Sequence, residues 1–164
     1  MENTTSQRLI AKAKVLKNFI EVSDKGAEYE ARPLGWNEKG LIGALQTLFT
    51  LRYFLFKGEE MLSDLRYDDV HDRFVIKKNQ NELVLDTSGF TYGGRKYEIK
   101  TTMRELDLIE NTDGQSKLVG KGHFGMSSYS LELESYPDEL GDIIKEVAVL
   151  YIVKKMTWSM IGPI

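Results

Sequence analysis

The side chains with the clearest potential to bind a metal ion lie in the segment Asp68-Asp69-Val70-His71-Asp72. Carboxylate oxygens are ligands for hard divalent cations, and imidazole nitrogens are ligands for transition metals. The candidate metal ligands are therefore Asp69, His71 and Asp72. Their spacing fits neither an EF-hand loop nor a His-Glu-x-x-His helix, and aspartate is frequent in turns. We therefore expect a solvated hairpin loop here, with no metal ion and no other cofactor.

Nucleophilic catalysis would have to use His71 or His123, because the chain has two histidines and no cysteine. A catalytic histidine also needs a positioned partner. The segment Gly122-His123-Phe124-Gly125-Met126 lacks the serine of the Gly-x-Ser-x-Gly nucleophile elbow. We therefore expect a protein without catalytic activity. A hydrolase of unknown substrate that uses Asp72 and a histidine is kept as an alternative.

The glycine pattern of residues 120–125, Gly-Lys-Gly-His-Phe-Gly, matches the letters of a dinucleotide-binding fingerprint. That fingerprint needs a helix directly after it, because the helix N-terminus holds the pyrophosphate. The residues that follow alternate between polar and apolar instead, which predicts a strand. The pattern therefore predicts no nucleotide site.

Basic side chains on the polar face of one predicted strand, with further lysines as candidate neighbours, could bind phosphate headgroups. Near an anionic membrane, each Lys or Arg contributes roughly 1 kcal/mol of attraction. Glu98 and Glu105 accompany the basic residues, so a mixed and solvated barrel wall fits the pattern equally well. The residues predicted to form this lipid-headgroup site are Lys96, Lys100, Arg104, Lys117 and Lys121.

Composition limits the class of protein. The 164 residues suffice for one domain with a sizeable core. A content of 41% hydrophobic and 29% charged residues is typical of globular proteins and argues against a disordered chain. With 22 Lys+Arg against 25 Asp+Glu, the net charge is −3, so we expect no nucleic-acid partner. The absence of cysteine excludes disulfides, thiolate metal sites and palmitoylation.

Neither a signal peptide nor a membrane-spanning helix is predicted. The first twenty residues carry four basic side chains without an apolar run. Residues 41–56 and 143–164 are rich in apolar side chains, but polar or charged residues interrupt both stretches, and a spanning helix needs roughly 20 mostly apolar residues. We expect a cytoplasmic protein that meets a membrane only at its periphery.

From residue 11 to about residue 135 the sequence is typical of an all-β chain. Short apolar-rich runs are separated by turn sequences such as Asn111-Thr112-Asp113-Gly114. Alternation places Tyr97, Ile99, Thr101 and Met103 on one side of a strand. Residues 37–47 fit either a short helix or a loop over a barrel mouth. The predicted strands are residues 12–22, 28–32, 48–56, 61–67, 73–77, 82–86, 95–103, 105–110, 117–124 and 127–134, with 89–92 as a further one.

The sequence period changes after Pro137. Asp138 and Glu139 suit the first turn of a helix, and residues 142–160 contain neither Pro nor Gly, so we predict a helix over residues 138–160. Residues 147–153 are apolar around the whole circumference, whereas a helix that lies on a sheet needs an apolar arc of about 100°. Such a helix should be surrounded on all sides. A buried strand and a membrane-facing tail are the alternatives for this segment.

The predicted strands are long enough to surround this helix. An apolar helix of eleven residues is about 16 Å long, and a tilted eight-residue strand gives a barrel wall roughly 20 Å high. Eleven-stranded barrels are known to hold a central helix. We therefore predict a mainly β fold, with a closed antiparallel β-barrel of about 10–12 strands around a C-terminal hydrophobic central α-helix, in one domain over residues 1–164. Lys154 is expected at the rim, where substitution by Asp should be tolerated.

This pattern resembles the tubby-like family, which includes the tubby C-terminal domain, phospholipid scramblases and LURP-one-related proteins. The resemblance rests on Lys12-Ala13-Lys14-Val15-Leu16, on Leu51-Arg52-Tyr53-Phe54-Leu55-Phe56-Lys57-Gly58 and on the ending Asp142-Ile143-Ile144-Lys145-Glu146-Val147-Ala148-Val149-Leu150-Tyr151-Ile152-Val153. It implies a barrel threaded by its terminal helix, with phospholipid contact or an undefined small-ligand or scaffold role. The cysteine-rich or proline-rich region of scramblases has no counterpart here, and the phosphoinositide site of tubby is not carried over to particular residues.

These observations favour a non-catalytic binding module whose basic outer face contacts anionic phospholipid or a membrane surface. The main alternative is a carrier of a small apolar ligand in a lipocalin-like bore. The terminal helix would compete with such a ligand for the same space.

Overall fold

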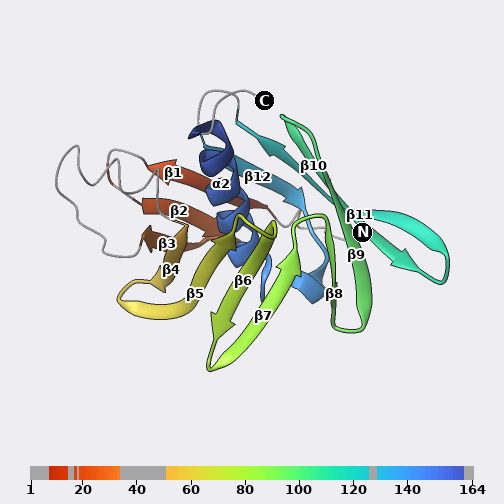
Figure 1. Cartoon of the computed structure of the whole chain (residues 1–164), viewed down its shortest axis with the longest axis horizontal. Coiled ribbons are helices and arrows are strands. Elements are labelled where there is room, and N and C mark those ends of the chain that lie inside the picture. The colour runs from red at the N-terminus through yellow and green to blue at the C-terminus, as the bar shows by residue number, and fades with distance from the viewer. Residues whose placement is uncertain (1–7, 15–16, 18, 34–50, 126–128, 161–164) are drawn as a thin grey trace.

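The computed structural model of the chain is a closed antiparallel β-barrel with one long helix inside it (Figure 1). The structure describes residues 8–14, 17, 19–33, 51–125 and 129–160, the last three by their backbone. Within these residues twelve strands form the barrel, so the predicted fold class is confirmed. The strands are β1 (Leu9–Lys14), β2 (Phe19–Asp24), β3 (Ala27–Pro33), β4 (Arg52–Lys57), β5 (Glu60–Asp68), β6 (Arg73–Lys78), β7 (Asn81–Asp86), β8 (Gly89–Tyr92), β9 (Arg95–Thr101), β10 (Glu105–Thr112), β11 (Gln115–Phe124) and β12 (Ser130–Ser135).

Consecutive strands lie side by side around the barrel, and β1 pairs with β12 to close it. Tight turns between antiparallel strands require residues that accept a positive φ. Asp113 and Gly114 supply this conformation between β10 and β11, with φ values of 51° and 77°. The turn predicted from the Asp-Gly pair is therefore confirmed.

Alternation along each strand decides which side chains enter the barrel. In β9, Tyr97 and Ile99 are 1% and 7% exposed, while Lys100 is exposed on the other side. The prediction that Thr101 and Met103 continue the buried side is wrong. Strand β9 ends at the exposed Thr101, and Met103 lies in the turn before β10 with 83% of its surface exposed.

The single strand predicted over residues 12–22 is also wrong, because β1 and β2 are two strands with a reversal between them. The sequence between them, Val15-Leu16-Lys17-Asn18, contains neither Gly nor Pro, so the sequence pattern gives no sign of a break there. The additional strand predicted at residues 89–92 is confirmed as β8. The predicted segment 37–47 and the first residues of the strand predicted over 48–56 lie outside the described residues.

The helix α2 (Ile144–Met160) runs through the interior and contacts β1, β2, β5, β6 and β12 (Figure 1). Residues 147–153 are at most 5% exposed, so the barrel surrounds the helix on all sides. The buried strand and the membrane-facing tail are thereby excluded for this segment. The predicted start at residue 138 is wrong, because Asp138–Leu140 form a separate 3₁₀ helix, η2, and Gly141 lies in a turn before α2.

Side chains fill the space between α2 and the barrel wall. The ring of Phe74 meets the ring of Tyr151 edge-on at 4.9 Å, a favourable aromatic geometry. An apolar cavity of about 20 Å³ remains between α2 and strands β9–β12. This is about the space of one water molecule, so the cavity has no room for a lipocalin-type ligand. In the described part of the chain, no helix has the length and apolarity needed to cross a bilayer.

Candidate functional site

Four of the five predicted headgroup ligands share the outer side of strands β9–β11. Lys96 and Lys100 point outward from β9, and Arg104 lies in the exposed turn that follows. Lys100 is opposite Asp107 of β10, which is in turn opposite Lys121 of β11, so these residues form a row across three strands. We call Lys96, Lys100, Arg104 and Lys121 the cationic face.

The fifth residue, Lys117, lies on the other side of the sheet. It is opposite Glu110, whose carboxylate lies 3.1 Å from the guanidinium of Arg95. Arg95 alternates with Lys96 and so shares a side with the inward-pointing Tyr97. Directly opposite residues share one side of a sheet. Lys117 is therefore separated from the cationic face by the sheet itself.

A β-bulge in β11 explains why simple alternation wrongly predicts Lys117 and Lys121 on the same side of the strand. The register runs from Gly120 opposite Leu108 to Leu118 opposite Ile109, which leaves Val119 without a partner. One extra residue reverses the alternation of the strand beyond it. Counting every second residue along the sequence does not reveal this reversal.

Carboxylates interrupt the cationic face. Asp107 lies between Lys100 and Lys121 in the row, and Glu98 Oε1 lies 3.8 Å from Lys100 Nζ. Exposed ion pairs of this kind contribute about 0–1 kcal/mol to stability, so Lys100 can leave Glu98 and bind an external anion instead. Lys96, Arg104 and Lys121 form no ion pair within the described residues. Most of the positive charge is thus available to an external anion.

An exposed apolar tip adjoins the cationic face at Met103. The ammonium of Lys155, from α2, donates a hydrogen bond of 2.8 Å to the Met103 carbonyl oxygen. The same ammonium lies 3.9 Å from the centre of the Phe124 ring. Burial lowers the pKa of Lys155. These contacts fix the Met103 turn to the carboxyl-terminal half of α2, with the exposed Arg104 next to it in the chain.

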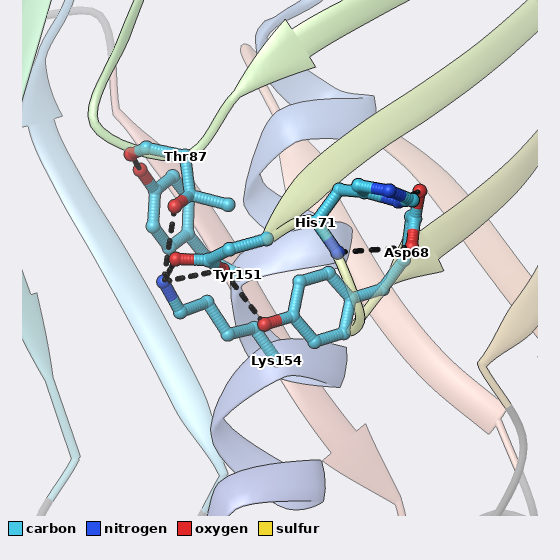
Figure 2. A network of polar contacts seen from close by, with 7 residues as sticks. Asp68, His71, Thr87, Tyr151 and Lys154 are labelled. Carbon is cyan, nitrogen blue, oxygen red and sulfur yellow. Dashed lines mark hydrogen bonds and ion pairs between the residues drawn. The ribbon is translucent and has the colours of Figure 1, made fainter.

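A polar network ties the same part of α2 to the β5–β6 turn (Figure 2). Lys154 Nζ lies 3.0 Å from Asp72 Oδ1 and donates to Thr87 Oγ1 at 3.1 Å. The Tyr67 hydroxyl donates to Asp72 at 2.7 Å, and the Tyr151 hydroxyl donates to the Thr87 carbonyl oxygen. Burial pushes the pKa of Asp72 upward, but hydrogen bonds from Tyr67, Lys154 and Thr87 outweigh it and lower the pKa.

The candidate metal ligands do not converge on a common point. His71 Nδ1 lies 2.9 Å from Asp68 Oδ2, whereas Asp72 turns to Lys154 and Asp69 is exposed. Among the residues that the structure describes, no group of three acidic or histidine side chains is arranged to hold a metal ion. The segment forms the hairpin turn that the sequence predicts, with Asp72 at a φ of 52°.

Each histidine is paired with an acid other than Asp72. His123 Nε2 lies 2.6 Å from Glu134 Oε1 on the outer surface, where the two side chains are 43% and 52% exposed. His71 contacts Asp68, and Asp72 accepts hydrogen bonds from Tyr67 and Lys154. The Asp72–histidine pair of the hydrolase hypothesis therefore does not form in this arrangement.

The glycine pattern at residues 120–125 serves strand packing. Its residues 120–124 lie in β11, and the next element in the described part of the chain is strand β12, which pairs with β11. A Cβ atom at Gly122 would lie 2.7 Å from Leu133 Cδ2 and 3.0 Å from the Glu132 carbonyl oxygen. Glycine is required there because the neighbouring strand approaches so closely.

Sequence reasoning missed Lys155 and Met103 as neighbours of the cationic face. Their only signals were the basic pair Lys154-Lys155, which ends an apolar run, and a methionine next to Arg104. The two residues are 52 positions apart in the chain, and only the path of α2 through the barrel brings them together. Comparison with known proteins adds no further residue, since no protein-family model, curated protein or solved structure matches this chain.

Proposed function

We propose that this protein is a non-catalytic binding module that contacts anionic phospholipid headgroups through the cationic face. The proposal is carried by the placement of exposed Met103 beside Lys100 and Arg104 at one edge of the barrel. Interfacial binding combines insertion of apolar side chains with attraction of basic ones to anionic lipid. An apolar tip flanked by basic residues meets both requirements.

Membership of the tubby-like family is part of the same proposal. It is supported by the antiparallel barrel and by the apolar helix α2 that threads it. Phospholipid contact is one role that the resemblance implies. A peripheral location on the cytoplasmic side of a membrane fits both the resemblance and the cationic face.

The carrier hypothesis has less support, because α2 occupies the bore and leaves a cavity of about 20 Å³ beside β9–β12. A small apolar ligand would have to displace part of the helix. The outer surface, by contrast, is available to a membrane without any rearrangement of the core.

Co-sedimentation with vesicles tests the proposal. The full chain is mixed with vesicles of phosphatidylcholine alone, or with added phosphatidylserine, at several salt concentrations. We expect binding only to the anionic vesicles and release as salt rises, because a Debye length of about 8 Å at physiological salt screens exposed charges. Replacing Lys96, Lys100 and Arg104 by Glu should weaken binding by a factor on the order of 100, since each basic residue contributes roughly 1 kcal/mol.

The matched control replaces Lys25, Lys57 and Lys77 by Glu, which changes the net charge equally at exposed positions away from the cationic face. This control should keep most of the binding. A second variant, Met103→Ser, should weaken binding without altering its salt dependence. Equal loss in the two charge-reversal variants would show that net charge alone governs binding, and the cationic face would be abandoned as the site.

A further inference from the structure

The junction between β7 and β8 is paired differently from every other junction of the barrel. It registers one residue pair, Asp86 with Gly89, whereas each of the other junctions between described strands registers at least four. Residues 81–85 of β7 therefore pair with β6 alone. Their backbone groups on the β8 side meet no partner strand in the described chain, which is the defining property of a sheet edge. Figure 1 shows β7 and β8 diverging from the turn that joins them.

A buried ion pair holds the β7 side of this junction. At the end of the β6–β7 hairpin, Lys78 Nζ lies 2.6 Å from Glu146 Oε1 and also donates to the Asp142 carbonyl oxygen. On the β8–β9 side, Arg95 lies 3.7 Å from Glu139 of η2, an exposed pair that contributes little. The β6–β7 hairpin is thus fixed to the start of α2 rather than to β8.

A groove of about 630 Å³ lies at this junction, with Val84 and Asp86 of β7 on one side and Phe90 and Lys96 of β8 and β9 on the other. Its volume lies within the range of about 300–1,000 Å³ that is typical of ligand sites. An unpaired strand edge beside a groove of this kind is the surface to which extended peptides add as a further strand. Main-chain hydrogen bonds provide affinity in that mode, and alternate side chains provide specificity.

The outward side chains of β7 indicate the chemistry of the added strand. Glu82, Val84 and Asp86 alternate along this strand and are exposed, with Val84 at 45%. Asp86 forms no ion pair with a described residue, and Glu82 has only a distant one, 3.6 Å to Lys77. Oppositely charged and apolar pairs directly across an antiparallel ladder are stabilising. A complementary strand therefore carries a basic, an apolar and a basic residue at alternate positions.

The same pattern disfavours a second copy of this chain as the occupant. If two β7 strands paired antiparallel about Val84, Glu82 of each copy would be brought next to Asp86 of the other. Like charges directly opposite each other are destabilising. Charge complementarity therefore points to a different protein with a basic segment.

We propose that the β7–β8 junction is a strand-addition site for an extended segment of a partner protein, with the alternating pattern basic–x–apolar–x–basic. The segment pairs antiparallel with residues 81–85 of β7, with its apolar residue opposite Val84, one basic residue opposite Glu82 and the other beside Asp86, which itself pairs with Gly89. The pairing groups belong to β7 and not to the cationic face, of which Lys96 alone also lines the groove.

The test uses the full chain and the labelled synthetic peptide TRTVTRT, acetylated and amidated at its ends. Binding is followed by fluorescence anisotropy, and backbone amide hydrogen exchange locates the contact. We expect saturable binding with slowed exchange in residues 81–86. The N–H of Thr87 donates to the Asp72 carbonyl oxygen on the β6 side, so by alternation Glu82 and Val84 turn their backbone groups toward β8. N-methylation of the peptide valine, which lies opposite Val84, therefore removes one ladder donor and should weaken binding at least about tenfold. The acidic peptide TETVTET should also bind more weakly, because one glutamate would lie opposite Glu82 and the other beside Asp86.

A charge-reversal variant, Glu82→Lys with Asp86→Lys, should reverse the order and prefer TETVTET, a gain that an unfolded variant cannot show. Glu59→Lys with Glu60→Lys makes the same change of net charge in the β4–β5 turn and should leave the preference for TRTVTRT intact. Equal affinity for TRTVTRT and its N-methylvaline form would overturn the proposal, since charge alone would then explain binding. Amide hydrogen exchange that slows outside residues 81–86 would also overturn the proposal. So would self-association of the protein that Val84→Lys abolishes, because the occupant of the site would then be a second copy of the chain.

Discussion

The ammonium of Lys78 lies 2.6 Å from a carboxylate oxygen of Glu146, a residue with no exposed surface. Glu146 belongs to the first turn of α2, where a negative charge also interacts favourably with the helix dipole. Ser63 Oγ donates to the same oxygen at 3.4 Å, and the second carboxylate oxygen has no partner among the described side chains and backbone. Lys78 therefore provides most of the favourable interaction that offsets the cost of burying the Glu146 carboxylate.

Replacement of Lys78 by Met should destabilise the protein by about 3–5 kcal/mol, because it leaves the Glu146 carboxylate buried without a cation. Chemical unfolding in urea measures this loss. Lys77→Met is the matched control, since the Lys77 side chain is 57% exposed and its ion pair with Glu82 is 3.6 Å long. That control should cost less than about 1 kcal/mol. Equal unfolding midpoints for the two variants would contradict the role assigned to Lys78.

A carboxylate introduced into the centre of α2 should unfold the protein. Val149 is fully buried inside the barrel, so Val149→Asp creates an unpaired buried charge that costs several kcal/mol out of a total stability of about 5–15 kcal/mol. Circular dichroism and the dispersion of amide proton resonances detect the loss. Val70→Asp is the same change at a site that is 82% exposed, and its melting temperature should stay close to that of the wild type. A cooperative, wild-type-like transition in Val149→Asp would be incompatible with a helix enclosed by the barrel.

Substitution of Lys154 by Asp should be harmful, contrary to the tolerance predicted from sequence. The Lys154 side chain is 23% exposed, and its ammonium lies 3.0 Å from Asp72, so the new carboxylate would face an existing one. We expect a loss of roughly 1–3 kcal/mol, larger than for Lys154→Met, because like charges at this separation are unfavourable.

The double variant Lys154→Asp with Asp72→Asn should recover part of the stability by removing the like charge. Asparagine also accepts the positive φ of residue 72. Unfolding in urea compares the three proteins. If the second substitution only adds to the loss, the damage does not come from the Asp72 carboxylate.

Asp68 should make folding stability depend on pH in the acid range. The side-chain hydrogen bond from His71, with a further one from Arg73, lowers the pKa of Asp68 from 3.8 to about 2. A pKa that is lower in the folded state means that the unfolded chain binds the proton first, so stability rises with pH across this window. The contribution is complete above about pH 5 and is lost progressively as the pH falls through about 2.

Asp68→Asn should flatten this part of the stability profile. Urea unfolding at intervals between pH 5 and pH 2 measures it, and Asp69→Asn, at the exposed neighbour, should leave the slope unchanged. Identical slopes in the wild type and Asp68→Asn would show that the His71–Asp68 contact does not stabilise the carboxylate.

Local sequence patterns were sufficient to predict the class of fold. The alternation that buries Tyr97 and Ile99 determines a sheet with one dry face, and an apolar segment at residues 147–153 with no polar side determines a helix that is enclosed. Both patterns arise from the geometry of one element, whose side chains recur at a period of 2 or 3.6 residues. Nearby residues are enough to show them.

Longer-range features depended on the tertiary structure. The bulge at Val119 moved Lys117 to the other side of the sheet, and β7 pairs with β8 at Asp86 alone while Lys78 binds the start of α2. The pairs Lys78–Glu146 and Lys154–Asp72 join positions that are far apart in sequence. The sequence by itself determined the elements and their buried sides, whereas only closure of the barrel around α2 decided which charges meet. The physical reason is that an ion pair depends on distances between elements, and these distances are set by the packing of the whole core.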